Sequence, residues 1–273
     1  MKRKILLLAG AFALLLSSCT MKDNVPPQIY FKVSSPDTAI VGKAYNIPLP
    51  PNGVTCDDNF DGQEVQKNLK YTYNIPVGEV AGTTIYPSTT GKYSITYTLT
   101  DEAGNQTSKT LDVIVYNEAQ KYTTWYRATR SSNEFINSDY NIYDNVFVKL
   151  DYDKHKNKRI IFPKLSNING LVVYGDIFYG DTTLFVDIPM QEVPLIDTTG
   201  STPDTVLFVI RNQTSTSSYF VDTVNYKILL KYDINLYKKS DQANADYIST
   251  DETYGRYWKN YKTDNCTETF IKM

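Results

Sequence analysis

The chain contains little histidine and cysteine and has no excess of basic over acidic residues. The low histidine count and the charge balance limit the functions it can have. Its 273 residues include one His and three Cys. A single His excludes metal sites built from several His side chains. It leaves only His155 for a His-based catalytic triad, and that residue lies in the charged stretch 153–159, which is typical of a solvated hairpin turn. Lys and Arg number 28 against 30 Asp and Glu, so the chain has no electrostatic footprint for nucleic acid.

Motifs that carry catalysis are also missing. The chain has no phosphate-binding Gly-rich loop, no GxSxG elbow and no HExxH pair. Glycoside hydrolysis needs two carboxyl groups about 5–10 Å apart, and the sequence singles out no such pair. We therefore predict a protein that is not an enzyme and has no catalytic residues. A hydrolase with an unrecognised carboxylate pair is a third interpretation, after the two binding functions given below.

One apolar run is present, at the N-terminus. Three basic residues at positions 2–4 precede the apolar residues 5–16, a run that suits a signal peptide and is too short to span a bilayer. The following Leu16-Ser17-Ser18-Cys19 resembles the lipobox of bacterial lipoproteins. The resemblance implies a signal peptide over 1–18, acyl chains such as palmitate on Cys19, and a lipidated tether over 19–27.

The residues after Cys19 bear on the destination of the protein. Thr20 is not the Asp that favours retention in the inner membrane. Lys22-Asp23-Asn24 resembles, in part, the export tag of surface lipoproteins in some Gram-negative anaerobes. We predict a lipid-anchored outer-membrane protein exposed on the cell surface, with periplasmic attachment left open. The other two cysteines, Cys56 and Cys266, fall in different predicted domains, and the sequence does not decide whether they pair.

The region 28–117 has the pattern of half-buried β-strands and predicts no helix. Apolar and aromatic residues alternate with polar ones over 93–100 and again over 111–115, and turn residues cluster between them at 101–105. Such a pattern predicts a hairpin of two strands, each with one buried face.

The same hairpin carries a family resemblance. Gly91-x-Tyr93-x-Ile95-x-Tyr97-x-Leu99-x-Asp101-x-x-Gly104-Asn105 resembles the end of bacterial Ig-like repeats of the DUF5011 and HYR-like types. Val41-Gly42 and the Asp-rich residues 57–62 match their upstream landmarks. The resemblance implies an Ig-like β-sandwich over 28–117, a spacer or binding module in which Tyr93 is a core or corner tyrosine. The stretch between Gly62 and Tyr93 is longer than in those repeats, so its strand register is not predicted.

A second β-rich domain of no recognised family is predicted over 121–273, as a sandwich or a barrel. Its clearest strand is 226–236, where every second residue is apolar or aromatic. The fold class is therefore all-β throughout. Further short apolar runs separated by turns lie at 146–152, 159–162, 170–178, 184–188 and 205–211.

Two groups of residues are candidate ligand sites. Asp57-x-Asn59-x-Asp61-Gly62 matches the first half of a calcium loop, but Asn68 stands where an EF-hand needs Glu. Calcium at Asp57, Asn59 and Asp61 is thus one possibility and an ordinary polar loop the other. Aromatic residues beside polar ones form the second group and would stack on sugar rings or simply pack in a core. They are Trp125, Tyr126, Tyr254, Tyr257, Trp258 and Tyr261, the last four spaced as one helical face.

These observations predict a non-catalytic binding module held at the membrane by its N-terminal lipid. Glycan is the preferred ligand class, because the aromatic groups are accompanied by polar side chains that can hold hydroxyls. The alternative is a structural or adhesive lipoprotein that binds a protein partner in a surface complex, since Tyr and Trp also mark protein interfaces.

Overall fold

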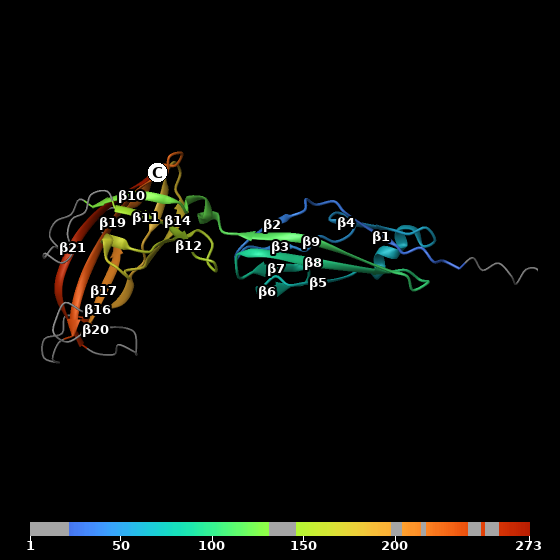
Figure 1. Cartoon of the computed structure of the whole chain (residues 1–273), viewed down its shortest axis with the longest axis horizontal. Helices are drawn as coiled ribbons and strands as arrows, with labels where there is room; N and C mark the ends of the chain where they lie inside the picture. Colours follow the sequence, from blue (N-terminus) through green and yellow to red (C-terminus); the bar gives the residue numbers. More distant parts are fainter. Residues whose placement is uncertain (1–21, 131–145, 198–203, 214–216, 240–246, 249–256) are drawn as a thin grey trace, which may run out of the picture. The chain divides into compact units, whose positions relative to one another are not determined.

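The computed structural model describes residues 22–130, 146–197, 204–213, 217–239, 247–248 and 257–273. The chain is all-β, as predicted, with about 56% strand and 8% helix. It divides into two compact units (Figure 1). Unit one contains the described residues up to Val115 except for two short segments, Ile40–Lys43 and Ser88–Thr90. These belong to unit two, with Tyr116–Met273.

Unit one is a β-sandwich of small antiparallel sheets. The four-stranded sheet has the order β2 (Asp37–Ile40), β9 (Gln106–Tyr116), β8 (Gly91–Thr100) and β5 (Lys70–Tyr73). The three-stranded sheet has the order β3 (Tyr45–Asn46), β7 (Thr84–Pro87) and β6 (Val77–Ala81). A two-stranded ribbon pairs β1 (Gln28–Phe31) with β4 (Val54–Asp57).

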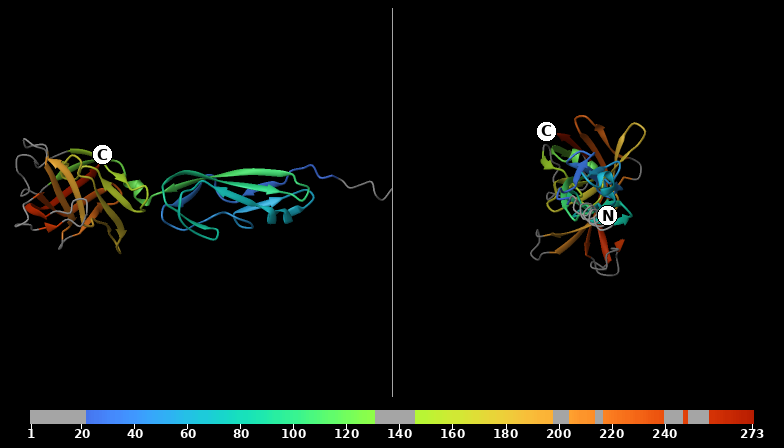
Figure 2. Two further views of the ribbon diagram at one scale, coloured as in Figure 1. Left: turned by 90° about the horizontal axis from the view of Figure 1, so that it is seen from below. Right: turned by 90° about the vertical axis from the view of Figure 1, so that its right-hand side faces the viewer.

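The β8–β9 hairpin is the longest element of unit one (Figures 1 and 2). Its strands pair without a break from Thr100 opposite Gln106 to Gly91 opposite Val115. Ile95, Tyr97 and Leu99 are fully buried on one face of β8, so the predicted alternation is confirmed.

Tyr97 is fully buried in this core and is hydrogen-bonded there. The Tyr97 hydroxyl donates to the carbonyl oxygen of Pro48 at 2.9 Å, and its ring lies 5.5 Å from that of Phe31. Tyr93 is only half-buried. Tyr93 and Tyr97 occupy the same face of β8, and the role of Tyr93 as a core or corner tyrosine stays a prediction.

A short 3-10 helix occupies the stretch for which no register was predicted. It is η1 (Gly62–Asn68), and it packs Val65 into the core before β5, β6 and β7 follow. The expectation of no helix in this domain was wrong. A helix of seven residues is too short to show a helical period in the sequence.

The polypeptide chain enters unit one near the start of β9 and leaves it at the end of the same strand. The Asn105 side-chain amide donates to the carbonyl oxygen of Asp23 at 3.4 Å, so the N-terminal segment lies beside the turn that precedes β9. From that turn β9 runs 11 residues to Tyr116, where unit two begins. At about 3.4 Å per residue this strand separates entry from exit by about 34 Å.

Unit two is built on one sheet of 12 strands that curls around a single core (Figures 1 and 2). Its main path has the order β11 (Val146–Lys149), β10 (Trp125–Arg130), β21 (Tyr257–Lys272), β19 (Lys227–Lys239), β18 (Ser218–Asp222), β15 (Leu184–Asp187), β14 (Val173–Tyr179), β13 (Arg159–Phe162) and β12 (Asp151–Tyr152). Off this path, β17 (Asp204–Asn212) pairs with β19 and β16 (Gln191–Asp197), and β20 (Tyr247–Ile248) pairs with β21.

The two ends of the path, β11 and β12, are separated in the chain by Leu150 alone. The sheet is therefore nearly closed, like a barrel, which agrees with the predicted alternatives of sandwich or barrel. Two short 3-10 helices, η2 (Glu118–Tyr122) and η3 (Leu165–Asn167), complete the unit.

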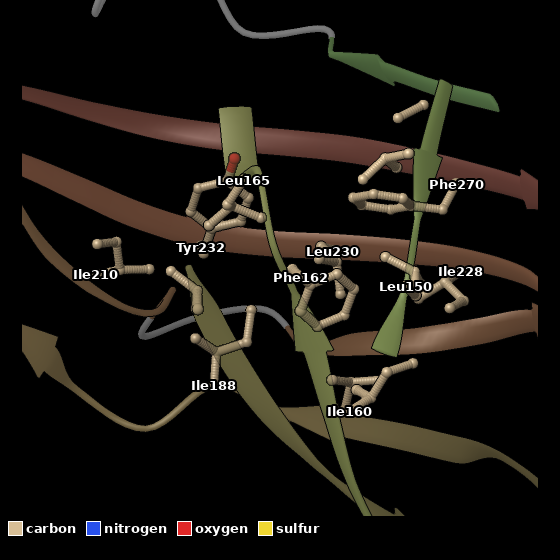
Figure 3. Packing of buried hydrophobic residues seen from close by; sticks show 14 of the residues in the cluster. Leu150, Ile160, Phe162, Leu165, Ile188, Ile210, Ile228, Leu230, Tyr232 and Phe270 are labelled. Atoms are coloured by element: carbon tan, nitrogen blue, oxygen red, sulfur yellow. The ribbon is translucent and has the colours of Figure 1, made fainter. Parts of the chain in front are cut away.

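The core of unit two fills the inside of this sheet (Figure 3). Ile228, Leu230, Tyr232 and Ile234 alternate inward along β19 and are fully buried, as the sequence pattern of 226–236 predicted. Phe162 on β13 packs against Phe270 on β21, with ring centroids 5.4 Å apart. Strands that are distant in the sequence are thus joined through aromatic contacts.

Candidate functional site

A pocket of about 440 Å³ opens on unit two, and we call it the tyrosine pocket. Its volume lies in the range of small-molecule sites. Three separate segments build it: the end of η2, the turn between β14 and β15, and the turn between β18 and β19. Its lining is Lys121, Tyr122, Tyr179, Gly180, Asp181, Thr182, Thr183, Leu184, Thr223 and Tyr226.

Three tyrosine rings form the walls and the floor. Tyr122 is buried and packs edge-on against Tyr226, with ring centroids 5.3 Å apart. It also packs on Phe220 at 4.7 Å, which ties the floor to the core. Tyr179 is 58% exposed and presents its ring to solvent at the end of β14. The pocket thus joins a fixed aromatic floor to an accessible aromatic wall.

The β18–β19 turn is held by local hydrogen bonds that place Tyr226. The Asp222 carboxylate accepts the amides of Val224 and Asn225 at 2.8 and 3.0 Å and the Asn225 side chain at 2.8 Å. The Asn225 backbone, first among these donors, lowers the pKa of Asp222. Tyr226 follows in the left-handed region, with φ of 50°. The hydrogen-bonded turn therefore fixes the position of the Tyr226 ring.

Lysine ammonium groups lie over the tyrosine rings. Lys121 Nζ is 4.9 Å from the centroid of Tyr122, Lys158 Nζ is 4.8 Å from that of Tyr179, and Lys272 Nζ is 4.4 Å from that of Tyr226. The side-chain hydrogen bond with Tyr122 is the main cause that raises the pKa of Lys121. The pocket therefore combines aromatic faces with cationic donors, and Asp181 supplies the one carboxylate of its lining.

This arrangement suits a sugar more than a purely apolar ligand. The C–H faces of a pyranose ring can pack on Tyr179 or Tyr226, while ammonium, carboxylate and threonine hydroxyl groups bind its hydroxyls. Sequence reasoning missed the pocket because its segments are some 40 to 60 residues apart. The available signal was a tyrosine beside turn residues, which occurs at 179–183 and again at 222–226.

The adjacent pair Trp125 and Tyr126 is divided by strand alternation. Trp125 on β10 is 53% exposed, whereas Tyr126 is fully buried and its hydroxyl donates to the carbonyl oxygen of Tyr122 at 2.8 Å. Tyr126 is a core residue, so its predicted place on a binding surface is corrected. Trp125 shares the outer face with Arg127, and opposite them on β11 lie the exposed Phe147 and Lys149.

The predicted helical face near the C-terminus is not formed. Tyr257, Trp258 and Tyr261 lie on the long strand β21, where successive residues face opposite sides of the sheet. Their side chains, all of Tyr254, and Cys19 lie outside the described residues. Aromatic residues at 257, 258 and 261 follow a helical spacing and not a period of two, so the local sequence pattern favoured a helix where the structure has a strand.

The predicted calcium residues differ in their surroundings, and calcium binding by them stays a prediction. Asp57 is exposed at the end of β4, Asn59 is exposed, and Asp61 accepts the amide of Glu102 at 2.9 Å. The residue between the first two, Asp58, is the buried one. Cys56 and Cys266 are both buried free thiols, so these two residues form no disulfide.

A polar cluster, the Glu268 cluster, lies sealed inside unit two. Glu268 is fully buried and accepts the Tyr232 hydroxyl at 2.7 Å and the Ser166 amide at 3.3 Å. Arg130 is also buried and donates to Cys266 Sγ at 2.7 Å. Burial raises the pKa of Glu268 to about 8. With no access to solvent, the cluster has no route for a substrate and serves the interior of the sheet.

Comparisons with known proteins give only weak likenesses. No family model and no curated protein matches the chain. The lipoprotein BT2262 from Bacteroides thetaiotaomicron is 10% identical, with a TM-score of 0.25, over 90% of this chain and all of that one. A CBM51-2 and INT domain structure of Clostridium perfringens ZmpB, solved with GlcNAc, is 10% identical, with a TM-score of 0.25, over 90% of this chain and 44% of that one.

A Bacteroides ovatus protein of unknown function is 13% identical, with a TM-score of 0.24, over 91% of this chain and 93% of that one. Likeness at this level assigns neither a fold family nor a ligand. The Ig-like repeat family of unit one thus stays a prediction. Across the part of the chain that the structure describes, no helix has the length and apolarity needed to cross a membrane.

Proposed function

We propose that this chain is a lipid-anchored outer-membrane protein, exposed on the cell surface, that binds glycan in the tyrosine pocket and catalyses no reaction. The observation that carries the proposal is the combination, in one pocket, of exposed Tyr179 with Lys121 and Asp181. The lipobox at Cys19 supports the location. Unit one supports a spacer role, since its entry and exit are about 34 Å apart.

Ring stacking and hydroxyl binding act together in such a site. Tyr179 offers a face that costs little to desolvate, because an aromatic ring has no hydrogen bonds to lose there. Lys121 and Asp181 then select the orientation of the sugar through directional hydrogen bonds. Neighbouring Lys158 and Lys272 add positive charge, so acidic sugars should bind more tightly than neutral ones of the same size.

A glycan array with the purified full chain in detergent tests the proposal, with neutral and uronate-containing glycans as separate arms. We expect Tyr179→Ala to weaken binding at least about ten-fold, the equivalent of losing about 1.4 kcal/mol. Phe178→Ala is the matched control, since Phe178 is also exposed, lies next to Tyr179 on β14 and is absent from the pocket lining.

Two outcomes contradict the proposal. Binding lost in Trp125→Ala but kept in Tyr179→Ala would move the site to the outer face of β10. Absence of binding to every glycan would remove glycan as the ligand class.

A protein partner is the second candidate function, favoured by the outer face of β10 and β11. Trp125 lies opposite Lys149, and Arg127 lies opposite Phe147, all four exposed. Trp and Arg are enriched among the residues that dominate protein interfaces. Cross-linking on intact cells, followed by purification of the chain, should capture one defined surface protein. Trp125→Ala should abolish that capture, whereas Tyr179→Ala should leave it intact.

A further inference from the structure

Three carboxylates meet at one end of unit one, and we call them the aspartate triad. Asp23 lies in the N-terminal segment before β1, Asp58 follows β4, and Asp101 follows β8. One carboxylate oxygen from each lies within 4.8 Å of the other two. Asp58 and Asp101 are buried and Asp23 is half-buried. Segments 78 residues apart in sequence thus bring like charges together, away from bulk water.

Asp58 leaves one buried oxygen without a protein partner. Its Oδ1 accepts the amides of Phe60 and Asp61 at 2.8 and 2.9 Å. Its Oδ2 is buried and has no hydrogen-bond partner among the described residues, although the side chain is 8% exposed. A buried carboxylate oxygen without a partner is destabilising, so this atom favours a bound ligand that the described residues do not supply.

The triad also lacks a compensating base. Within the described residues, no Lys, Arg or His forms an ion pair with Asp23, Asp58 or Asp101. Three acids this close repel one another unless a cation lies between them.

The surrounding loops hold the triad in place before any ion binds. The Asn105 side chain donates to Asp101 Oδ2 at 2.7 Å, and its backbone amide donates to Asp101 Oδ1 at the same distance. Asp61 accepts the Glu102 amide and thereby ties the loop after β4 to the turn after β8. The Asp23 carboxylate accepts the Val25 amide at 3.0 Å. The arrangement is fixed by hydrogen bonds on all three sides.

The donor set and its dimensions select among cations. All-oxygen ligands suit a hard cation, and they exclude a zinc site of the usual sulfur and nitrogen type. Calcium binds oxygen at about 2.3–2.6 Å, so ligands across one ion stand up to about 5 Å apart. Magnesium, at about 2.1 Å, spans only about 4.2 Å. Separations of up to 4.8 Å are compatible with calcium. Three protein carboxylates around one ion also suit calcium better, because magnesium usually keeps several waters and takes only one or two carboxylates.

We propose that Asp23, Asp58 and Asp101 bind one calcium ion, which fastens the N-terminal segment to unit one. This inference is independent of glycan binding, because the aspartate triad lies in unit one and the tyrosine pocket in unit two. The proposed ligands differ from the set Asp57, Asn59 and Asp61 expected from the sequence. They include the neighbouring residue Asp58 instead. Asp23 lies four residues after Cys19 in the sequence, so the ion would hold the segment that follows the predicted lipid anchor.

Thermal unfolding of the full chain in detergent tests the site, after treatment with EDTA and return of either calcium or magnesium. We expect calcium to raise the melting temperature of unit one by at least about 5 °C, because it binds only the folded triad. Asp58→Asn and Asp23→Asn should lose this shift. Asp57→Asn is the matched control: it removes the same charge one position away and should keep the full shift.

Asp23→Asn guards against a folding artefact, since Asp23 lies outside every strand and its carboxylate accepts a hydrogen bond from the nearby Val25 amide. Isothermal titration calorimetry should give one calcium per chain. Trypsin cleavage after the exposed Lys22 should slow when calcium is added to the parent chain and remain unchanged in Asp23→Asn.

Three results would overturn the proposal. One is a parent chain whose melting temperature does not respond to calcium. Another is a calcium shift of equal size in Asp57→Asn, Asp58→Asn and Asp23→Asn, which would place the ion elsewhere. The third is equal stabilisation by magnesium, which would remove the assignment to calcium.

Discussion

At the scale of single residues, neighbouring positions have opposite roles in this protein. Trp125 is exposed while Tyr126 lies in the core, and Asp57 is exposed while Asp58 is buried. The sequence shows which residue types are present in a short stretch. It does not show which of two adjacent residues faces inward, unless a clear alternation sets the phase of the strand. At 57–61 every candidate ligand is polar, so no such phase could be read.

The Glu268 cluster makes a residue-scale prediction about pH. Burial raises the pKa of Glu268 from 4.5 to about 8, so between these values the folded chain holds a proton that the unfolded chain has released. The free energy of unfolding must therefore fall as the pH rises from about 4.5 to about 8, by an amount on the order of a few kcal/mol. Glu268→Gln should remove this fall, because its amide stays neutral.

Denaturant unfolding at several pH values measures the effect. Glu102→Gln is the control, since the Glu102 side chain is 70% exposed and should leave the pH profile of the parent unchanged. Parallel profiles for the parent and Glu268→Gln would contradict the prediction. Arg130, Tyr232 and Cys266 lie around the same site and are present in both the parent and Glu268→Gln, so the comparison isolates the carboxyl group of Glu268.

At the scale of elements, β8 offers a direct test of its two faces. Leu99 is fully buried, whereas the Thr98 hydroxyl lies 3.1 Å from that of Ser108 across the hairpin at the outer face. Leu99→Ala should lower the free energy of unfolding of unit one by about 2–5 kcal/mol, through lost burial and the cavity left behind. Thr98→Ala should cost less than about 1 kcal/mol. Calorimetry of both variants checks the prediction, and similar losses would contradict the assigned faces.

Elements with strict alternation were the ones that could be predicted. β8 and β19 follow from the sequence because one buried face imposes a period of two. Strand β21 was misread near its start, where the aromatic residues have a helical spacing and no period of two. The tyrosine pocket and the aspartate triad could not be predicted. Each is assembled from turns or segments whose proximity depends on how the sheets fold, and no local pattern encodes that.

At the scale of the whole molecule, the proposed location depends on one side chain, that of Cys19. If Cys19 carries the lipid, the chain should partition into the detergent phase of Triton X-114 and sediment with outer membranes. Cys19→Ser should move it to the aqueous phase, because acyl chains supply the membrane affinity. Protease treatment of intact cells then distinguishes surface exposure from periplasmic attachment. Equal partitioning of both proteins would contradict lipidation at Cys19.

The placement of entry and exit at the two ends of β9 has a mechanical consequence. A pull on unit two against a fixed N-terminus would act along β9, whose hydrogen bonds to β8 run across the strand. These bonds would be loaded in shear and share the force, where a pull across the hairpin would open them one at a time. Unit one is therefore arranged to transmit tension along its length.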